Sequence, residues 1–292
     1  MKHLVVTADD FGLAPEVNEA VEEAFRYGIL TTASLMAAEP AAADAVARAR
    51  HMPGLRVGLH LVLVEGRPVL PPERVPDLVD AQGLFRQSMV RAGVDFFFRP
   101  KVRRQLEAEI EAQFAAFAAT GLPLDHVNAH KHFHLHPTIA GLMLRIGKRH
   151  GAKAMRVPLE PTGVLAAVET ESKGRAEVTR PWARLLRRRL GKAGITTPDQ
   201  VFGLAWSGAM TAPRLAGLLA HLPEGLSEIY LHPAKAGGFP GAAPGYRYAE
   251  ELAALTDPTV ITAAGSTGIR RGGFADFLPS SPSSPEGGRG SG

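Results

Sequence analysis

The sequence predicts one α/β domain, a distorted (β/α) barrel of about seven parallel strands. Short apolar, β-branched runs alternate with helical patterns along most of the chain. The 292 residues are 45% hydrophobic, which is enough for one large core. Aspartate and histidine residues follow several of the expected strands directly. In barrels of this kind the carboxyl ends of the strands carry the reacting groups, so these positions are the first candidates for a site.

The first quarter of the chain has a β-α-β-α-β rhythm. Residues 3–8 are apolar and β-branched, as expected of a strand buried on both faces. Pro15 begins a helix that runs to about Arg26, and Gly28 ends it. Further elements are expected at 31–37 (strand), 40–50 (helix) and 55–61 (strand). This order implies parallel strands with right-handed crossovers.

Residues 62–101 contain too many prolines for long regular elements, and we expect a long loop that acts as a lid or a binding surface. After it, apolar residues recur at helical spacing over 102–119. The remaining expected strands are 124–130, 155–159, 201–206 and 228–231, and the remaining helices begin at Pro137 and cover 212–222 and 246–255. The catalytic domain is expected to span 1–270, followed by a disordered Gly/Ser/Pro-rich tail at 271–292.

Composition excludes several functions. The chain has no cysteine, so a transition-metal site must use histidine and carboxylate ligands. The net charge of +4 is too small to indicate a nucleic-acid partner. The N-terminus lacks the features of a signal peptide, and no apolar run approaches the ~20 residues of a membrane span. We expect a cytoplasmic protein, with room for contact at the inner membrane and for a homodimer.

Three short stretches supply carboxylate and imidazole groups that together look like a mononuclear metal site. They are Thr7-Ala8-Asp9-Asp10-Phe11-Gly12, Gly58-Leu59-His60-Leu61 and Asn128-Ala129-His130-Lys131-His132-Phe133-His134. Two adjacent carboxylates at a strand end are costly without a cation. A divalent ion held by one carboxylate and two imidazoles, beside a free carboxylate, can split a stable bond with water.

Simpler interpretations exist for each group. One aspartate could cap the helix that begins at Pro15. The histidines from His126 to His136 would share one face while the strand lasts, which we expect to be only to about His130, and they could form a structural metal site or a hydrogen-bonded stack. His232 ends another strand and could protonate a leaving group, or it could only support a neighbouring side chain.

These motifs, with Glu65-Gly66-Arg67-Pro68 and Leu231-His232-Pro233, resemble the YdjC/ChbG family of carbohydrate deacetylases in order and spacing, over about residues 3–265. The resemblance implies a distorted barrel, one divalent cation (Mg²⁺ or Zn²⁺), and removal of acetyl from an N-acetylated sugar. It suggests Asp10, His60 and His130 as metal ligands, Asp9 as the general base and His232 as the acid. We also expect substrate contacts from four residues: His132, His134, Arg156 and Arg67.

The sequence departs from the commoner family pattern, Asp-Ser-His-His-His, with Asn128-Ala129-His130-Lys131-His132. That form is similar to the branch associated with hopanoid biosynthesis (HpnK-like), which implies an N-acetylglucosaminyl lipid as substrate. The alternatives are a deacetylase of chitooligosaccharides, a non-haem iron oxygenase with the same ligand set, a metal phosphohydrolase, or a non-catalytic glycolipid-binding protein.

The segment 181–192 supports a lipid substrate independently. Trp182, Leu185, Leu186 and Leu190 fall on one helical face, and basic residues occupy the rest of the helix: Arg184, Arg187, Arg188, Arg189 and Lys192. A helix lying on an anionic membrane has this layout. A surface helix packed by its leucines has it too.

Overall fold

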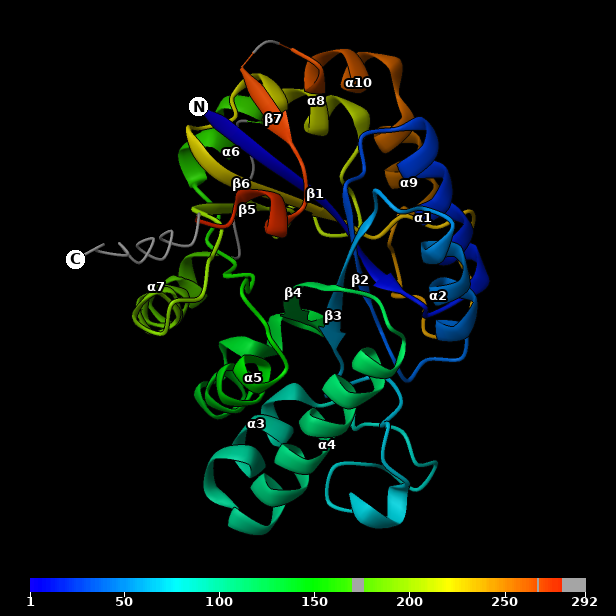
Figure 1. Ribbon diagram of the computed structural model, residues 1–292, viewed down its shortest axis with the longest axis vertical. Helices are drawn as coiled ribbons and strands as arrows, with labels where there is room; N and C mark the ends of the chain where they lie inside the picture. The colour runs from blue at the N-terminus through cyan, green and yellow to red at the C-terminus, as the bar shows by residue number, and fades with distance from the viewer. Residues whose placement is uncertain (170–175, 267, 280–292) are drawn as a thin grey trace, which may run out of the picture.

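Seven parallel strands form one curled sheet in this computed structural model, which describes residues 1–169, 176–266 and 268–279. The strands are β1 (Lys2–Phe11), β2 (Thr32–Leu35), β3 (Arg56–Leu61), β4 (Leu124–Ala129), β5 (Gln200–Phe202), β6 (Gly225–Leu231) and β7 (Ile269–Arg271). Their order is β4-β3-β2-β1-β6-β5, and β7 pairs with the start of β1. The predicted distorted barrel is confirmed (Figure 1).

The central strand, β1, sets the geometry of the sheet. It pairs with β6 from Lys2 to Ala8, and with β2 only from Thr7 onward. Beside its first three residues lies β7. The carboxyl ends of β1, β2, β3 and β6 therefore meet at one end of the barrel, where the sequence places its aspartates and histidines.

One expected strand is replaced by irregular chain. Residues 155–159 do not form a strand, and the seventh strand is β7 instead. Pro158 has no N–H to donate, and the Leu159 N–H turns back to the Val157 carbonyl. The segment still bridges the edge strands, because Arg156 N–H donates to Val127 of β4 and Val201 N–H of β5 donates to Leu159. This irregular bridge explains the distortion of the barrel.

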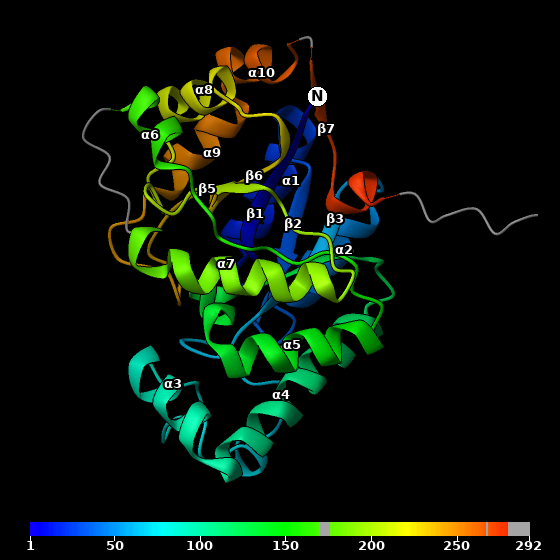
Figure 2. The same cartoon turned by 90° about the vertical axis from the view of Figure 1, so that its left-hand side faces the viewer.

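Helices surround the sheet (Figures 1 and 2). They are α1 (Pro15–Tyr27), α2 (Ala42–Arg50), α3 (Met89–Phe98), α4 (Pro100–Ala119), α5 (Pro137–Arg149), α6 (Thr162–Val168), α7 (Ala176–Lys192), α8 (Ala212–Ala220), α9 (Tyr248–Thr256) and α10 (Pro258–Ala264), with 3₁₀ turns η1 (Pro72–Arg74), η2 (His130–Leu135) and η3 (Phe274–Phe277). The expected helices all form. The proline-rich region 62–101 was expected to lack long regular elements, but its last part is α3, in which the Ser88 side chain caps the first turn. No helix in the described ranges could cross a membrane.

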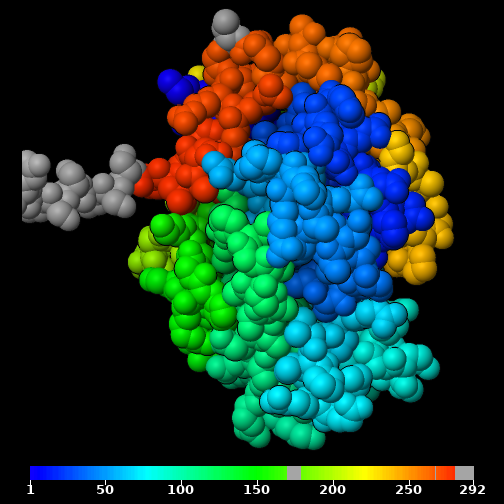
Figure 3. Space-filling model, turned by 45° about the vertical axis from the view of Figure 1, so that its right-hand side comes forward, coloured from blue at the N-terminus to red at the C-terminus, as the bar shows by residue number. Residues whose placement is uncertain are grey.

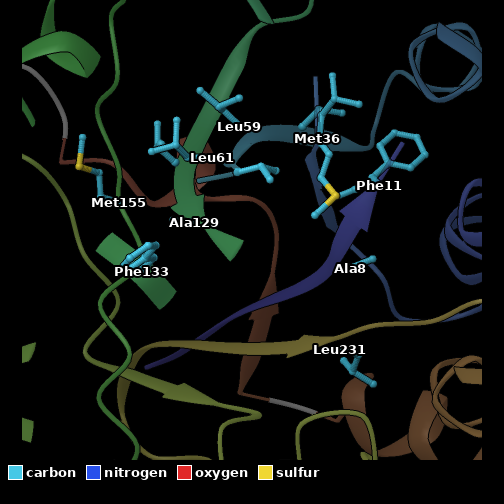
Figure 4. Close-up of a cluster of buried hydrophobic side chains, with 14 of the residues drawn as sticks. Ala8, Phe11, Met36, Leu59, Leu61, Ala129, Phe133, Met155 and Leu231 are labelled. Atoms are coloured by element: carbon cyan, nitrogen blue, oxygen red, sulfur yellow. The ribbon is translucent and has the colours of Figure 1, made fainter. Parts of the chain in front are cut away.

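Side-chain alternation along the strands separates the core from the site. Leu59 and Leu61 of β3 pack into the hydrophobic core, and Figure 4 draws them in one cluster with Phe11 and Met36. Because neighbours in a strand point to opposite faces, His60 must point into the barrel. Ala129 lies in the same core, so Asn128 also points inward.

The amino-terminal end of the barrel is closed by the C-terminal segment. Phe274 is fully buried with Val5 and Leu226, and the Phe274 N–H donates to the Asp125 carboxylate. The boundary expected after residue 270 therefore lies too early, because η3 is packed against the barrel, as its red atoms in Figure 3 show. The rest of the expected tail, 280–292, lies outside the described residues.

Candidate active site

The end of β1 presents two successive carboxylates at the same end of the barrel. In a regular strand, Asp9 and Asp10 would point to opposite faces. Here the register with β2 shifts between Ala8 and Phe11, and Asp10 has a left-handed backbone with φ 63°. Bulges of this kind re-aim side chains next to active sites. Asp9 consequently reaches Ser34 of β2, and Asp10 reaches the histidines of β3 and η2.

Asp10 does not cap the following helix. The residue before α1 is Ala14, whose position has no side-chain cap. The turn is held instead by buried Asn18, whose side-chain oxygen accepts the Gly12 N–H at 2.8 Å. Gly12 itself has φ 96°, a conformation that favours glycine. The Asp10 carboxylate is therefore available to the site.

Asp10, His60 and His130 come together as the sequence predicts. Each offers one ligand atom, and these atoms lie within 4.8 Å of one another. Asp10 Oδ1 is 3.2 Å from His60 Nε2 and 3.1 Å from His130 Nδ1. On its other side, His60 Nδ1 is 2.7 Å from Asn128 Oδ1. Because an amide oxygen only accepts, His60 donates there, and its Nε2 keeps a lone pair for a cation.

Electrostatics in this trio favour ionised Asp10. Burial alone would raise the pKa of Asp10, but the neighbouring His130 and His60 hold it well below the usual range. Burial would lower the pKa of His130, and the Asp10 carboxylate overrides it, so the pKa of His130 is raised. A cation would take the place of that proton, because a ligating imidazole must be neutral.

Asp9 is held by a buried arginine. Arg156 lies on the irregular bridge and is fully buried. It donates to both Asp9 oxygens, at 2.6 and 2.9 Å, and also to Glu228 Oε1 of β6, at 2.7 Å from Nη2. Burial would raise the pKa of Asp9, but the Arg156 charge keeps it far below the usual range. Asp9 is therefore ionised and fixed in orientation.

His232 lies at the end of β6 and is half-buried. Its backbone N–H donates to Glu251 Oε2 at 2.5 Å. Among the described residues none lies within hydrogen-bonding distance of its buried Nδ1. Burial lowers the pKa of His232, although the Asp10 and Asp9 charges act to raise it. The ring is therefore neutral at pH 7. It is also close enough to Asp9 and Asp10 for their charges to affect its pKa.

The four expected substrate contacts are placed differently from one another. His132 is half-buried, with Nε2 2.9 Å from the Tyr230 hydroxyl. His134 is buried and Nε2 donates to the Arg156 carbonyl at 3.1 Å, so it supports the bridge. Arg156 donates to both Asp9 and Glu228, as expected of a residue that positions another side chain. Arg67 is exposed, and its backbone N–H donates to Glu39.

From the sequence, Ser34, Glu228 and Glu251 were not singled out, and Asn128 was named in the third motif without a role of its own. Ser34 donates to Asp9 Oδ1 at 2.7 Å, and Asn128 Nδ2 donates to the same oxygen at 3.1 Å. Glu228 and Glu251 are charged residues among buried apolar neighbours, which is the signal that could have found them. Burial raises the pKa of Glu251 to about 7.

This chain matches a known protein family along most of its length. A sequence model of the family described as YdjC-like protein matches residues 3–264. A carbohydrate deacetylase from Geobacillus stearothermophilus is 30% identical over 94% of this chain and 98% of its own length. The human carbohydrate deacetylase is 30% identical over 91% of this chain and 88% of its own.

A crystal structure from Enterococcus faecalis, provisionally named for cellobiose-phosphate cleavage, superposes with a TM-score of 0.75 at 25% identity. The match covers 95% of this chain and 99% of that one. The fold is therefore shared along nearly the whole length of both chains.

Proposed function

We propose that this chain, which belongs to the YdjC-like family, hydrolyses the N-acetyl group from an N-acetylglucosaminyl substrate. The observation that carries the proposal is the convergence of Asp10, His60 and His130. The ionised carboxylate of Asp9 is on the residue next to Asp10. Two full-length relatives named carbohydrate deacetylases support the substrate class. Amide hydrolysis needs an activated water and a proton for the departing amine, and the site has candidates for both.

Asp10, His60 and His130 would hold one divalent cation. The fit is supported by the His60 tautomer, because the hydrogen bond to Asn128 leaves Nε2 free to ligate. When bound, the ion would lower the pKa of a water and polarise the acetyl carbonyl. One carboxylate and two imidazoles suit zinc, whereas magnesium prefers oxygen ligands, and the family resemblance leaves both ions as candidates.

Asp9 and His232 would move the protons. Asp9 accepts the proton of the attacking water, and its low pKa means that the proton is held only briefly. Neutral His232 is the stronger base, so the proton can pass to it, and the neighbouring carboxylates stabilise the imidazolium. His232 then donates to the amine as the C–N bond breaks. Acetate and the free amine leave.

The substrate we favour is a glycolipid, a glycosylated hopanoid in particular. The Asn128-Ala129-His130-Lys131-His132 form of the third motif supports this choice over chitooligosaccharides. His132 and the exposed Arg67 remain candidates for contacts with the sugar. Contact of 181–192 with the inner membrane would bring the enzyme to such a substrate.

Mass spectrometry tests the reaction. The enzyme is incubated without oxygen with N-acetylglucosaminyl hopanoid and with N,N′-diacetylchitobiose, and a loss of about 42 Da identifies deacetylation. Chelation should stop it, and added Mg²⁺ or Zn²⁺ should restore it. Asp9→Asn should lower kcat by about a hundredfold to ten-thousandfold with the bound metal retained. Full activity of Asp9→Asn would refute its role.

The alternatives have their own readouts. Turnover only with oxygen and a co-substrate identifies an oxygenase, and more than one metal per chain with phosphate release identifies a phosphohydrolase. Ligand binding without any product identifies a binding protein.

A further inference from the structure

Helix α3 exposes an apolar face to solvent. The exposed fractions are 80% for Val90, 53% for Val94, 47% for Phe97 and 71% for Phe98. Their spacing of four, three and one residues puts them on one side of the helix. The other side, with Ala92, Gly93 and Phe96, is buried. A soluble protein rarely leaves such a contiguous apolar face without a partner.

Helix α7 exposes a second apolar pair. Ala183, Leu186 and Leu190 are buried, whereas Trp182 and Leu185 are 54% and 56% exposed. The leucines expected to share one face are therefore divided between the core and the surface. Trp182, Leu185 and Arg189 are spaced three and four residues apart, so they share one exposed face of α7.

A single groove joins the two helices. It has a volume of about 620 Å³, and its floor is α5, from Pro137 to Arg145. Phe97 of α3 and Arg189 of α7 line it together. In Figure 2 the three helices face the viewer side by side, with α5 between α7 and the α3–α4 pair. We call the exposed faces of these helices, with the groove between them, the α3–α5–α7 surface.

This surface is basic as well as apolar. Arg184 and Arg188 are exposed on α7, and within the part of the chain that the structure describes no ion pair involves them. Arg187 is exposed too, but it does not line the groove and donates to the Asp199 carbonyl at 3.3 Å, so it is not part of this surface. Arg103 and Arg189 line the groove itself. Exposed aromatic and aliphatic side chains mixed with arginines are complementary to an anionic bilayer, which takes the apolar groups and attracts the cations.

The surface lies next to the candidate site. Helix α5 follows directly on η2, the turn that carries His130 and His132. The Phe96 ring is 5.6 Å from the Phe133 ring, and the Phe97 ring is 6.2 Å from the His136 ring. Whatever covers α3 therefore lies beside the loop that carries one of the candidate ligands.

From this arrangement we infer that the α3–α5–α7 surface docks the protein on an anionic lipid bilayer. A second copy of the chain fits less well, because a twofold contact through this surface would bring two sets of arginines together. The inference deepens the proposed function, which already includes contact of 181–192 with a membrane, but it does not depend on catalysis. It also extends the predicted contact beyond 181–192, because α3 contributes the larger apolar face.

Vesicle flotation of the purified full chain tests the inference. The probes are vesicles of phosphatidylcholine alone and vesicles of phosphatidylcholine with phosphatidylglycerol. We expect binding to the anionic vesicles, weakened by salt. Val94→Ser/Phe98→Ser on α3 and Trp182→Ser/Leu185→Ser on α7 should each weaken it by about tenfold or more, because each removes apolar area that the bilayer would bury.

Tyr27→Ser is the matched control. Tyr27 is 71% exposed, like Phe98, but it ends α1 and lies outside the surface. Its vesicle binding should equal that of the wild type. Should a double variant fail to fold, Phe98→Ser alone gives the same readout, since that side chain has few contacts to lose.

Three results would overturn the inference. The first is no binding of the wild type to anionic vesicles. The second is unchanged binding of the folded α3 variant. The third is a wild-type dimer that the α3 variant dissociates, with no vesicle binding, because the surface would then be an interface between copies. Deacetylase activity enters none of these readouts, so failure here is distinct from failure of the proposed function.

Discussion

Both ends of the barrel contain buried aspartate and histidine side chains, but the polar atoms of these side chains are used differently at the two ends. At the carboxyl end, Asp10, His60 and His130 aim ligand atoms at one point. At the amino end, Asp125 and His126 are also buried neighbours, with His126 Nδ1 2.9 Å from Asp125 Oδ2. There the carboxylate accepts the N–H groups of Phe274 and Ala275, and the His126 ring lies 4.7 Å from the Phe274 ring.

The difference shows that residue type alone does not make a site. The Asp125 oxygens are used by the backbone of η3, so that end is a cap for the barrel. Gly58 leaves room for the His126 ring in this arrangement, because a Cβ at residue 58 would lie 2.5 Å from that ring. At the other end, the Asn128 and Arg156 side chains orient His60 and Asp9 and leave the trio open. Chemistry is expected only where ligand atoms stay free.

The largest expected effect is from Asp10→Asn. Removing the carboxylate should release the metal and lower kcat/KM by more than about a hundredfold. A loss of that size is the most expected when the replaced residue only hydrogen-bonds to a metal ligand. Metal content by mass spectrometry and acetate release check this together. A variant that keeps both metal and activity would show that Asp10 is not a ligand.

Glu251→Gln tests how much the ionisation of a buried carboxyl group near the candidate site lowers the free energy of unfolding. Burial raises the pKa of Glu251 from 4.5 to about 7. The protonated carboxyl therefore stabilises the fold fully below pH 4.5, and this contribution is lost as the pH rises through about 7. The variant has no such titration. The free energy of unfolding of the variant, minus that of the wild type, should therefore rise by up to about 3 kcal/mol between pH 4.5 and 8.

Urea unfolding of both proteins across that pH range measures the gap. Groups that titrate in both proteins cancel in the difference. A gap that does not change with pH would mean that Glu251 ionises normally in the folded protein.

The sequence predicts much of this arrangement, for physical reasons that can be named. Buried strands have apolar, β-branched patterns, and the aspartates and histidines that follow them must meet at one end of a parallel barrel. The left-handed Asp10 backbone could not be predicted, because it depends on the register with β2. Nor could the clamp on Arg156, which joins residues far apart in the chain by distances of 2.6 and 2.7 Å. Local patterns do not encode such contacts.

The errors have a common cause. The 155–159 segment has the composition of a strand but contains Pro158, and tertiary contacts with β4 and β5 fix its irregular course. Residues 271–279 look like the start of a disordered tail, yet Phe274 finds a buried place at the closed end. In both segments a distant partner decides the structure.

The smallest effect is expected from Asp125→Asn at the closed end. The variant weakens charge-assisted hydrogen bonds to the N–H groups of Phe274 and Ala275, at 3.1 and 2.9 Å, so the free energy of unfolding should fall by about 1–2 kcal/mol. Activity per folded molecule should not change, because the residue lies at the other end of the barrel from Asp10. Urea unfolding and acetate release, measured on the same preparation as Asp10→Asn, give the contrast directly. Loss of activity without loss of stability in Asp125→Asn would mean that the closed end takes part in the reaction, and the division between the two ends would fail.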